Sequence, residues 1–358
     1  MNGKTNARLE RLFFFGRFFS PLYGMLMACR SNFYRQGIFQ QYRLEVPVIS
    51  VGNLLMGGTG KTPLVQYIAK LLQKHNRKPA ILSRGYKGSA TNAINIVSNT
   101  TEILLDAAEA GDEPRLLAEK LPGIPVITGK KRFTTGRFAI DSLGVDTLIL
   151  DDGFQHMALE RDLDLVLFNT QKLLGNGCVL PGGELREPLS ALKRAHAFII
   201  SGPYEPRDRN AEEFISLLGR LHPEKPIFTG TYEPEKMLTR ICHGKNDTIS
   251  HGDASKVPLY GFCAIARPES FRKTLETTGL KLTGFKSFED HHFYTARNIE
   301  SLLHNADHSG AEGLVTTEKD LVKLHHIFPI EFPLLVLPVR LRFGEDFDRF
   351  LTNHIASI

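Results

Sequence analysis

The stretch from Met56 to Pro63, MGGTGKTP, contains the residue types that bind a chain of phosphates. It follows an apolar, β-branched run and precedes a segment of helical periodicity, the context that a phosphate-binding loop requires. Small residues let consecutive backbone N–H groups turn toward phosphate oxygens, and the N-terminus of the helix adds partial positive charge. We therefore predict an ATP-type nucleotide site formed by Leu55, Met56, Gly57, Gly58, Thr59, Gly60, Lys61 and Thr62.

Two side chains of this loop have expected roles. Lys61 is expected to reach the β- and γ-phosphates, and the Thr62 hydroxyl to bind Mg²⁺. The strict pattern G-x-x-x-x-G-K-[ST] has a glycine where this chain has Leu55. Gly57 and Gly58 supply the conformational freedom of that glycine one turn later.

A pair of carboxylates, Asp151 and Asp152, ends the apolar run LGVDTLIL. Adjacent carboxylates disfavour each other's ionisation unless a cation is near, so we expect both to sit beside Mg²⁺ together with Thr62. One of them could instead cap the following turn. Gln155 and His156 follow closely enough to face the same cleft.

Four further stretches are unusual but carry no chemistry by themselves. In GDEP, Asp112 followed by Glu113 and Pro114 is an ordinary helix start. The run DHH at 290–292 is by itself a surface cluster, and composition assigns no role to SRGY at 83–86 or LPGGELREP at 180–188.

Strand-like and helix-like segments alternate from residue 46 onward, which predicts an α/β fold of the P-loop NTPase type with a doubly wound sheet. A second series begins near residue 230 and predicts a smaller α/β domain that includes PLLVLPVRLRF at 333–343. We expect a helical segment at 1–43, a kinase-type domain at 44–228 and the smaller domain at 229–358. The final strand could return to the first domain.

The first 43 residues carry seven basic side chains and one acidic one, a net charge of +6, while the whole chain carries +5. Basic residues alternate there with FFFGRFF and LYGMLM. Arg17 and Pro21 interrupt any transmembrane span, and Arg17 also fits a signal peptide badly. The remaining alternatives are an interfacial helix on an anionic membrane, which we favour, and a helix packed on the protein's own core.

Composition excludes several classes of protein. Of the 358 residues, 42% are hydrophobic and 23% charged, as in soluble globular enzymes. The four cysteines form no CxxC pair, which excludes a zinc ribbon or a disulfide framework and suits a reducing cytosol. No basic stripe accompanies the later domain, so we expect no nucleic-acid partner.

Taken together, these stretches resemble the tetraacyldisaccharide 4′-kinases of lipid A biosynthesis. The resemblance rests on pieces that occur in the family's order: VGNLLMGGTGKTP, ILSRGYKG, GDEP, ITGKKR, LDDGFQH, LPGGELREP, FEDHHFY and LVTTEKDLVKL. It implies transfer of the γ-phosphate of ATP to the 4′-hydroxyl of a tetraacylated disaccharide 1-phosphate, with ATP and Mg²⁺ as cofactors.

The resemblance also implies roles for individual residues. Asp112 becomes the general base, assisted by His291 or alternatively His292, with Lys61 and Asp152 also catalytic. Substrate or nucleotide contacts are implied for Arg84, Tyr86, Glu113, Arg132, Gln155 and Glu187. Because GGE precedes LREP here, Glu184 competes with Glu187 for the functional position.

The resemblance further implies a monomeric enzyme on the cytoplasmic face of the bacterial inner membrane, bound peripherally or monotopically to an anionic surface. Two other functions use the same loop: a P-loop switch or partitioning ATPase, and a P-loop kinase of a soluble small molecule. A switch needs no Asp112 and His291 motifs, and a soluble acceptor needs no membrane-seeking N-terminus.

Overall fold

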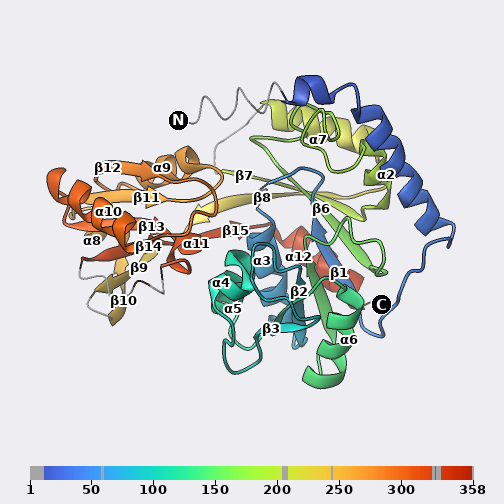
Figure 1. Cartoon of the computed structure of the whole chain (residues 1–358), viewed down its shortest axis with the longest axis horizontal. Coiled ribbons are helices and arrows are strands. Elements are labelled where there is room, and N and C mark those ends of the chain that lie inside the picture. Colours follow the sequence, from blue (N-terminus) through green and yellow to red (C-terminus); the bar gives the residue numbers. More distant parts are fainter. Residues whose placement is uncertain are drawn as a thin grey trace.

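The computed structural model describes residues 12–57, 60–203, 209–242, 245–324, 327 and 332–356. Its strands form two sheets, of nine and six strands, that lie side by side (Figure 1). The expected α/β fold with a large, mostly parallel sheet is confirmed.

The larger sheet has the order β15-β8-β7-β6-β1-β5-β2-β4-β3. All neighbours run parallel except the two edge pairs, β3 with β4 and β15 with β8. The strands are β1 (Val48–Gly52), β2 (Pro79–Ser83), β3 (Asn95–Ser98), β4 (Val126–Thr128), β5 (Thr147–Asp151), β6 (Leu163–Asn169), β7 (Ala197–Pro203), β8 (Ile227–Pro234) and β15 (Val339–Arg342).

Helices cover both faces of this sheet, because its central strands are apolar on both sides. One face packs against α3 (Lys61–Lys74), α5 (Asp112–Lys120) and α12 (Glu345–Ala356). The other packs against α6 (Arg132–Leu143) and α7 (Arg209–Leu221). The short α4 (Ala107–Ala110) and the 3₁₀ helix η1 (Leu189–Arg194) complete this part.

The smaller sheet has the order β10-β9-β14-β13-β11-β12, and its four later strands are parallel. The strands are β9 (Met237–Cys242), β10 (Lys245–Ser250), β11 (Leu259–Cys263), β12 (Leu282–Ser287), β13 (Gly313–Thr317) and β14 (Leu334–Leu337). Its helices are α8 (His251–Ala254), α9 (Pro268–Thr277), α10 (Ala296–His308) and α11 (Glu318–Leu321).

The strand expected at 333–343 is two strands that belong to different sheets. Pro338 separates β14 from β15, since proline cannot donate to a strand ladder. The chain thus passes between the sheets twice, at 235–236 and at 338, and Glu235 N–H donates to the Pro338 carbonyl at 2.8 Å. The expected boundary at 228–229 falls inside β8, and the division into domains stays a prediction.

The N-terminal helix α2 (Ser20–Arg35) runs along the larger sheet's part of the molecule (Figure 1). Ser20 Oγ donates to the Val179 carbonyl and accepts from Gly182 N–H, both at 2.9 Å. At Gly16, a Cβ atom would lie 2.2 Å from the Pro181 carbonyl oxygen, so only glycine permits this close packing.

A buried polar network anchors the smaller sheet. Asp320 is fully buried; it accepts hydrogen bonds from Tyr294 Oη and Ala264 N–H, both at 3.0 Å, and pairs with Lys323 at 2.7 Å. Burying charges is unfavourable unless they are paired and hydrogen-bonded, and these are.

Replacing Asp320 by alanine should therefore leave the Lys323 ammonium buried and unpaired. We expect a loss of about 3–5 kcal/mol in the free energy of unfolding, measured by urea denaturation. Glu276→Ala, which removes an exposed pair with Arg272, is the control and should leave the midpoint nearly unchanged. Equal midpoints for both variants would contradict this account of the network.

Candidate active site

The predicted phosphate-binding loop lies between the carboxyl end of β1 and the start of α3. Gly60 has φ +92°, and a Cβ atom there would lie 1.7 Å from Tyr232 Oη, so glycine is required. Leu55 is 2% exposed and packs in a cluster with Leu54 and Leu185, which accounts for the missing glycine. Met56 is exposed, whereas Gly58 and Thr59 lie outside the described residues.

Lys61 begins α3, and its side chain is only 10% exposed. Its ammonium lies 3.3 Å from Asp152 Oδ1 and 3.3 Å from Asn53 Oδ1. Thr62 follows as a buried residue in the first turn. The N-terminal end of α3 thus presents the Lys61 ammonium and the Thr62 hydroxyl beside β5, the strand that ends at Asp151.

Asp151 ends β5 and is buried. Its Oδ2 accepts weakly from Ser83 Oγ at 3.5 Å, and its Oδ1 has no hydrogen-bond partner among the described residues. Burial, followed by the charge of Glu113, raises the pKa of Asp151 to about 7, although Lys61 opposes the shift. A buried carboxylate oxygen with no partner fits a cation ligand.

Asp152 differs from Asp151 in its backbone conformation, its partners and the direction of its pKa shift. Its backbone is left-handed, with φ +58°, and its carboxylate pairs with Arg186 at 2.8 Å and with Lys61. Burial opposes ionisation, but Lys61 and Arg186 outweigh it and lower the pKa of Asp152. Neither aspartate acts only as a turn cap. Asp152 forms ion pairs with the side chains of Lys61 and Arg186.

Arg132, Gln155 and His156 line the same edge of the sheet. Arg132 is 3% exposed, and burial lowers its pKa to about 10 although Asp151 and Asp152 favour its charge. Gln155 donates to the Asn53 carbonyl at 2.9 Å. Burial and nearby arginines lower the pKa of His156 to about 4, so His156 is neutral at pH 7.

Asp112 meets His291 from the other sheet: His291 Nδ1 lies 3.0 Å from Asp112 Oδ2. Asp112 is the first residue of α5, whose N-cap is Gly111, and no side chain caps this helix. His291 follows β12 and has φ +63°, an uncommon backbone conformation for a residue other than glycine. Tyr86 lies next to the pair, with its ring 6.5 Å from that of His291.

His292 has a different partner. Its Nε2 lies 3.0 Å from Asn298 Oδ1, and its ring stacks on Phe288. Of the two histidines that sequence reasoning left open, the structure brings His291 to Asp112 and places His292 at the start of α10.

The two candidate glutamates both have basic partners. Glu184 pairs with Lys172 at 2.6 Å, and Glu187 is 2% exposed and pairs with Arg194 at 2.7 Å. In the segment 180–188, the side chain that reaches Asp152 is Arg186. Sequence reasoning missed this residue although it lies in LREP. Arg84 is exposed, but its charge contributes to lowering the pKa values of Arg132 and His156, so it lies near both.

Nothing in the described ranges gathers three or more histidine, cysteine, aspartate or glutamate side chains into a metal centre. Oxygens of Asp151 and Thr62 fit Mg²⁺, which commonly uses one or two protein ligands, waters and substrate phosphates.

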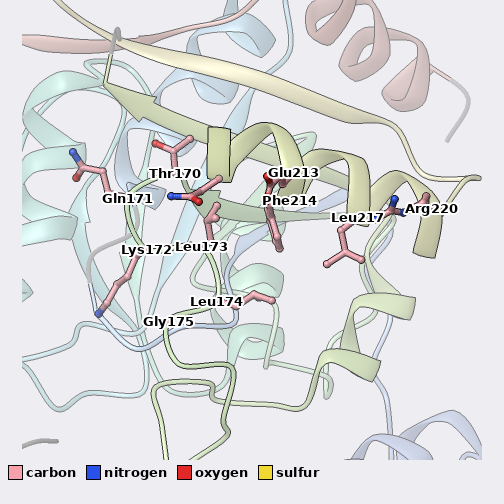
Figure 2. Close-up of a pocket in the computed structure, with 11 residues that line it drawn as sticks. Thr170, Gln171, Lys172, Leu173, Leu174, Gly175, Glu213, Phe214, Leu217 and Arg220 are labelled. Atoms are coloured by element: carbon pink, nitrogen blue, oxygen red, sulfur yellow. The ribbon is translucent and has the colours of Figure 1, made fainter. Parts of the chain in front are cut away.

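A separate hollow of about 580 Å³ lies between the loop after β6 and helix α7 (Figure 2). Phe214 and Leu217 extend from α7 toward Leu173 and Leu174 of the loop. It is lined by none of the predicted site residues, so it is distinct from the phosphate-binding edge.

Comparisons with known proteins identify a matching family and similar relatives. Residues 12–356 match the family described as tetraacyldisaccharide-1-P 4′-kinase. The chain is 45% identical to the tetraacyldisaccharide 4′-kinase of Desulfotalea psychrophila over 97% of both chains. It is 39% identical to that of Syntrophus aciditrophicus, over 90% of this chain and 87% of the relative.

A solved structure is also similar. LpxK from Aquifex aeolicus in complex with ATP superposes with a TM-score of 0.74 at 31% identity, covering 94% of this chain and 97% of that one.

The raised pKa of Asp151 predicts a pH-dependent stability in the absence of divalent cations. Burial holds the pKa of Asp151 in the fold near 7, above its ordinary value of 3.8. The loss of stability from this carboxyl is therefore absent below about pH 4, grows as pH rises from about 4 to about 7, and is constant above that. Asp151→Asn removes this loss and should exceed wild type at pH 8 by on the order of 1–4 kcal/mol.

Chemical denaturation in EDTA between pH 4 and 8 measures this difference. Asp152→Asn is the matched control with the opposite sign, because the ionised form of Asp152 is favoured in the fold. Parallel stability curves for wild type and Asp151→Asn would contradict the prediction.

Proposed function

Since this chain belongs to the tetraacyldisaccharide-1-P 4′-kinase family, we propose that it transfers the γ-phosphate of ATP to the 4′-hydroxyl of a tetraacylated disaccharide 1-phosphate, the precursor of lipid A. One observation carries the mechanism: the Asp112–His291 contact beside the phosphate-binding edge. The contact supplies a base for an acceptor hydroxyl, which the fold's nucleotide loop alone does not.

In this mechanism, Asp112 takes the proton of the acceptor hydroxyl on the carboxylate oxygen that does not face His291. The hydroxyl oxygen forms a bond to the γ-phosphorus, the bond to the β-γ bridging oxygen breaks, and ADP leaves. Lys61 neutralises charge on the transferring group. Asp152 and Arg186 hold Lys61 in place through the ion pairs described above.

Asp151 and Thr62 are the proposed ligands of Mg²⁺, with Asp152 oriented beside them. When bound, the metal ion neutralises charge on the β- and γ-phosphates. The unpartnered Oδ1 of Asp151 supports this assignment. Arg84, Tyr86, Glu113, Arg132, Gln155 and Glu187 remain the proposed substrate and nucleotide contacts, and Glu187 acts through Arg194.

The N-terminal segment supplies a surface for a lipid acceptor. One face of α2 contacts the site directly: Tyr23 Oη donates to the Arg186 carbonyl at 3.2 Å, and Arg30 donates to the Gln155 carbonyl at 3.3 Å. Its other face and the preceding turns expose apolar side chains: Leu12, Phe14, Phe15, Phe18, Phe19, Leu22, Met25 and Leu26.

Packing on the protein's own body therefore accounts for only one face of this segment. No helix in the described part of the chain is both long and apolar enough to cross a membrane. We propose peripheral or monotopic docking of a monomer on the anionic, cytoplasmic face of the bacterial inner membrane, with Arg17 and Arg35 facing headgroups.

The catalytic assignment predicts that Lys61→Ala and Asp112→Asn each lower kcat by about 10²- to 10⁴-fold, since each removes charge stabilisation or the base. The assay is ATP-dependent phosphorylation of tetraacyldisaccharide 1-phosphate in detergent micelles. Asp307→Asn, on the exposed face of α10, is the matched control and should retain wild-type activity.

A switch ATPase or a kinase of a soluble acceptor gives different results in the same assay. ATP hydrolysis that proceeds equally well without the lipid would support a switch. Activity toward a soluble sugar that exceeds activity toward the lipid would support the other kinase class.

The docking assignment predicts that the triple variant Phe14→Ser, Phe15→Ser, Phe18→Ser binds anionic vesicles about 10-fold more weakly or worse, because apolar burial drives interfacial binding. Co-sedimentation with vesicles measures the bound fraction. The double variant Ile103→Ser, Leu104→Ser removes exposed apolar side chains elsewhere and should bind normally. Unchanged binding of the triple variant would exclude this segment as the dock.

A further inference from the structure

The short helix α11 lies where the two sheets meet, and its residues reach elements of both. Glu318 pairs with Lys120 of α5 at 2.7 Å and with Arg340 of β15. Asp320 belongs to the buried network of the smaller sheet. The residue between them, Lys319, faces the Asp112–His291 pair.

Lys319 lies among groups from both sheets, and its side chain is 20% exposed. Its Nζ is 3.3 Å from His291 Nε2, 3.5 Å from Asp290 Oδ1 and 3.7 Å from Glu113 Oε1. Glu113 is adjacent to Asp112 on α5, whereas Asp290 and His291 follow β12. The lysine therefore contacts both sides of the proposed catalytic contact.

The chemistry of these partners determines the form of the imidazole. An ionised carboxylate only accepts hydrogen bonds, so His291 Nδ1 must carry a proton toward Asp112. A lysine ammonium only donates, and Lys319 Nζ lies closer to His291 Nε2, at 3.3 Å, than Asp290 Oδ2 does, at 3.8 Å; Nε2 is therefore the acceptor toward Lys319. Both requirements are met by the neutral imidazole with its proton on Nδ1.

We propose that Lys319 is a positioning residue that holds His291 as this neutral Nδ1–H form. With Nδ1–H donated to one carboxylate oxygen, the other oxygen of Asp112 is left to accept the hydroxyl proton. Without the lysine, the carboxylates of Asp112 and Asp290 still face the two ring nitrogens of His291, which favours the imidazolium. A positive charge against Asp112 makes it a weaker base.

The surrounding backbone keeps Lys319 in this position. Asp320 Oδ1 accepts from Ala264 N–H, and the Ala264 carbonyl accepts from His291 N–H at 3.3 Å. Lys323 Nζ donates to the same carbonyl at 3.1 Å. The loop of His291 and the helix of Lys319 thus share one buried anchor.

The proposal's role for Lys319 in proton transfer rests on the proposed function, but the form of His291 does not. The first measurement is therefore NMR of protein labelled with ¹⁵N-histidine, with His291→Gln to assign the signal. Wild type should show a neutral ring protonated at Nδ1 at pH 7.5. Lys319→Met should show an imidazolium, and Lys319→Arg should resemble wild type.

Kinetics form the second measurement. Lys319→Met should lower kcat by about 10- to 100-fold, leave KM for ATP within about twofold of wild type, and move the acid side of the pH–rate profile up by roughly one pH unit. Lys319→Arg should recover most of the activity. Lys281→Met, an exposed lysine before β12, is the control and should match wild type.

Two results would overturn the proposal: an Nε2–H ring or an imidazolium at His291 in wild type, or an unchanged ring form and pH profile in Lys319→Met. If Lys319→Met does not fold, the proposal is tested by the ring form of His291 in wild type and in Lys319→Arg, which must both be the neutral Nδ1–H form. If the protein phosphorylates no lipid, the NMR result still tests the role of Lys319, and the proposed function fails separately.

Discussion

The contact between Asp112 and His291 is the interaction on which the arrangement of the site depends. It joins the first residue of α5, at the larger sheet, to a loop that follows β12 of the smaller sheet. The two residues of this contact come from different sheets, so neither sheet alone provides it. The relative placement of the two sheets is therefore part of the catalytic geometry, and the ion pairs of Glu318 and Lys319 contribute to it.

Electrostatics separates the two clusters of the site into different tasks. Around Asp152, two cations stabilise one carboxylate, which keeps Lys61 near the phosphate-binding loop. One residue earlier, Asp151 is buried with an oxygen that no described group satisfies. Of these adjacent positions, Asp152 has a left-handed backbone, and its side chain contacts Lys61 and Arg186.

Much of this could be predicted from the sequence. The phosphate-binding loop, the strand that carries Asp151 and Asp152, and the α/β class follow from local patterns, because each depends on neighbours in the chain. Contacts between distant segments do not follow in this way. The choice of His291 over His292 and the partners of Lys319 depend on how the two sheets pack. The contact of Arg186 with Asp152 depends on how two loops of the larger sheet meet. Pro338 marks a break in the final strand, but nothing local assigns its two halves to different sheets.

The double passage of the chain at 235–236 and 338 also bears on how the protein is assembled. Residues 237–337 are inserted between β8 and β15, which are neighbours in the larger sheet. The last helix completes that sheet's core, since Phe347, Leu351 and Ile355 pack beside Ile49 and Leu64. The larger sheet therefore gains its edge strand β15 only after the whole stretch 237–337 has been added to the chain, whereas every strand of the smaller sheet lies within that one stretch.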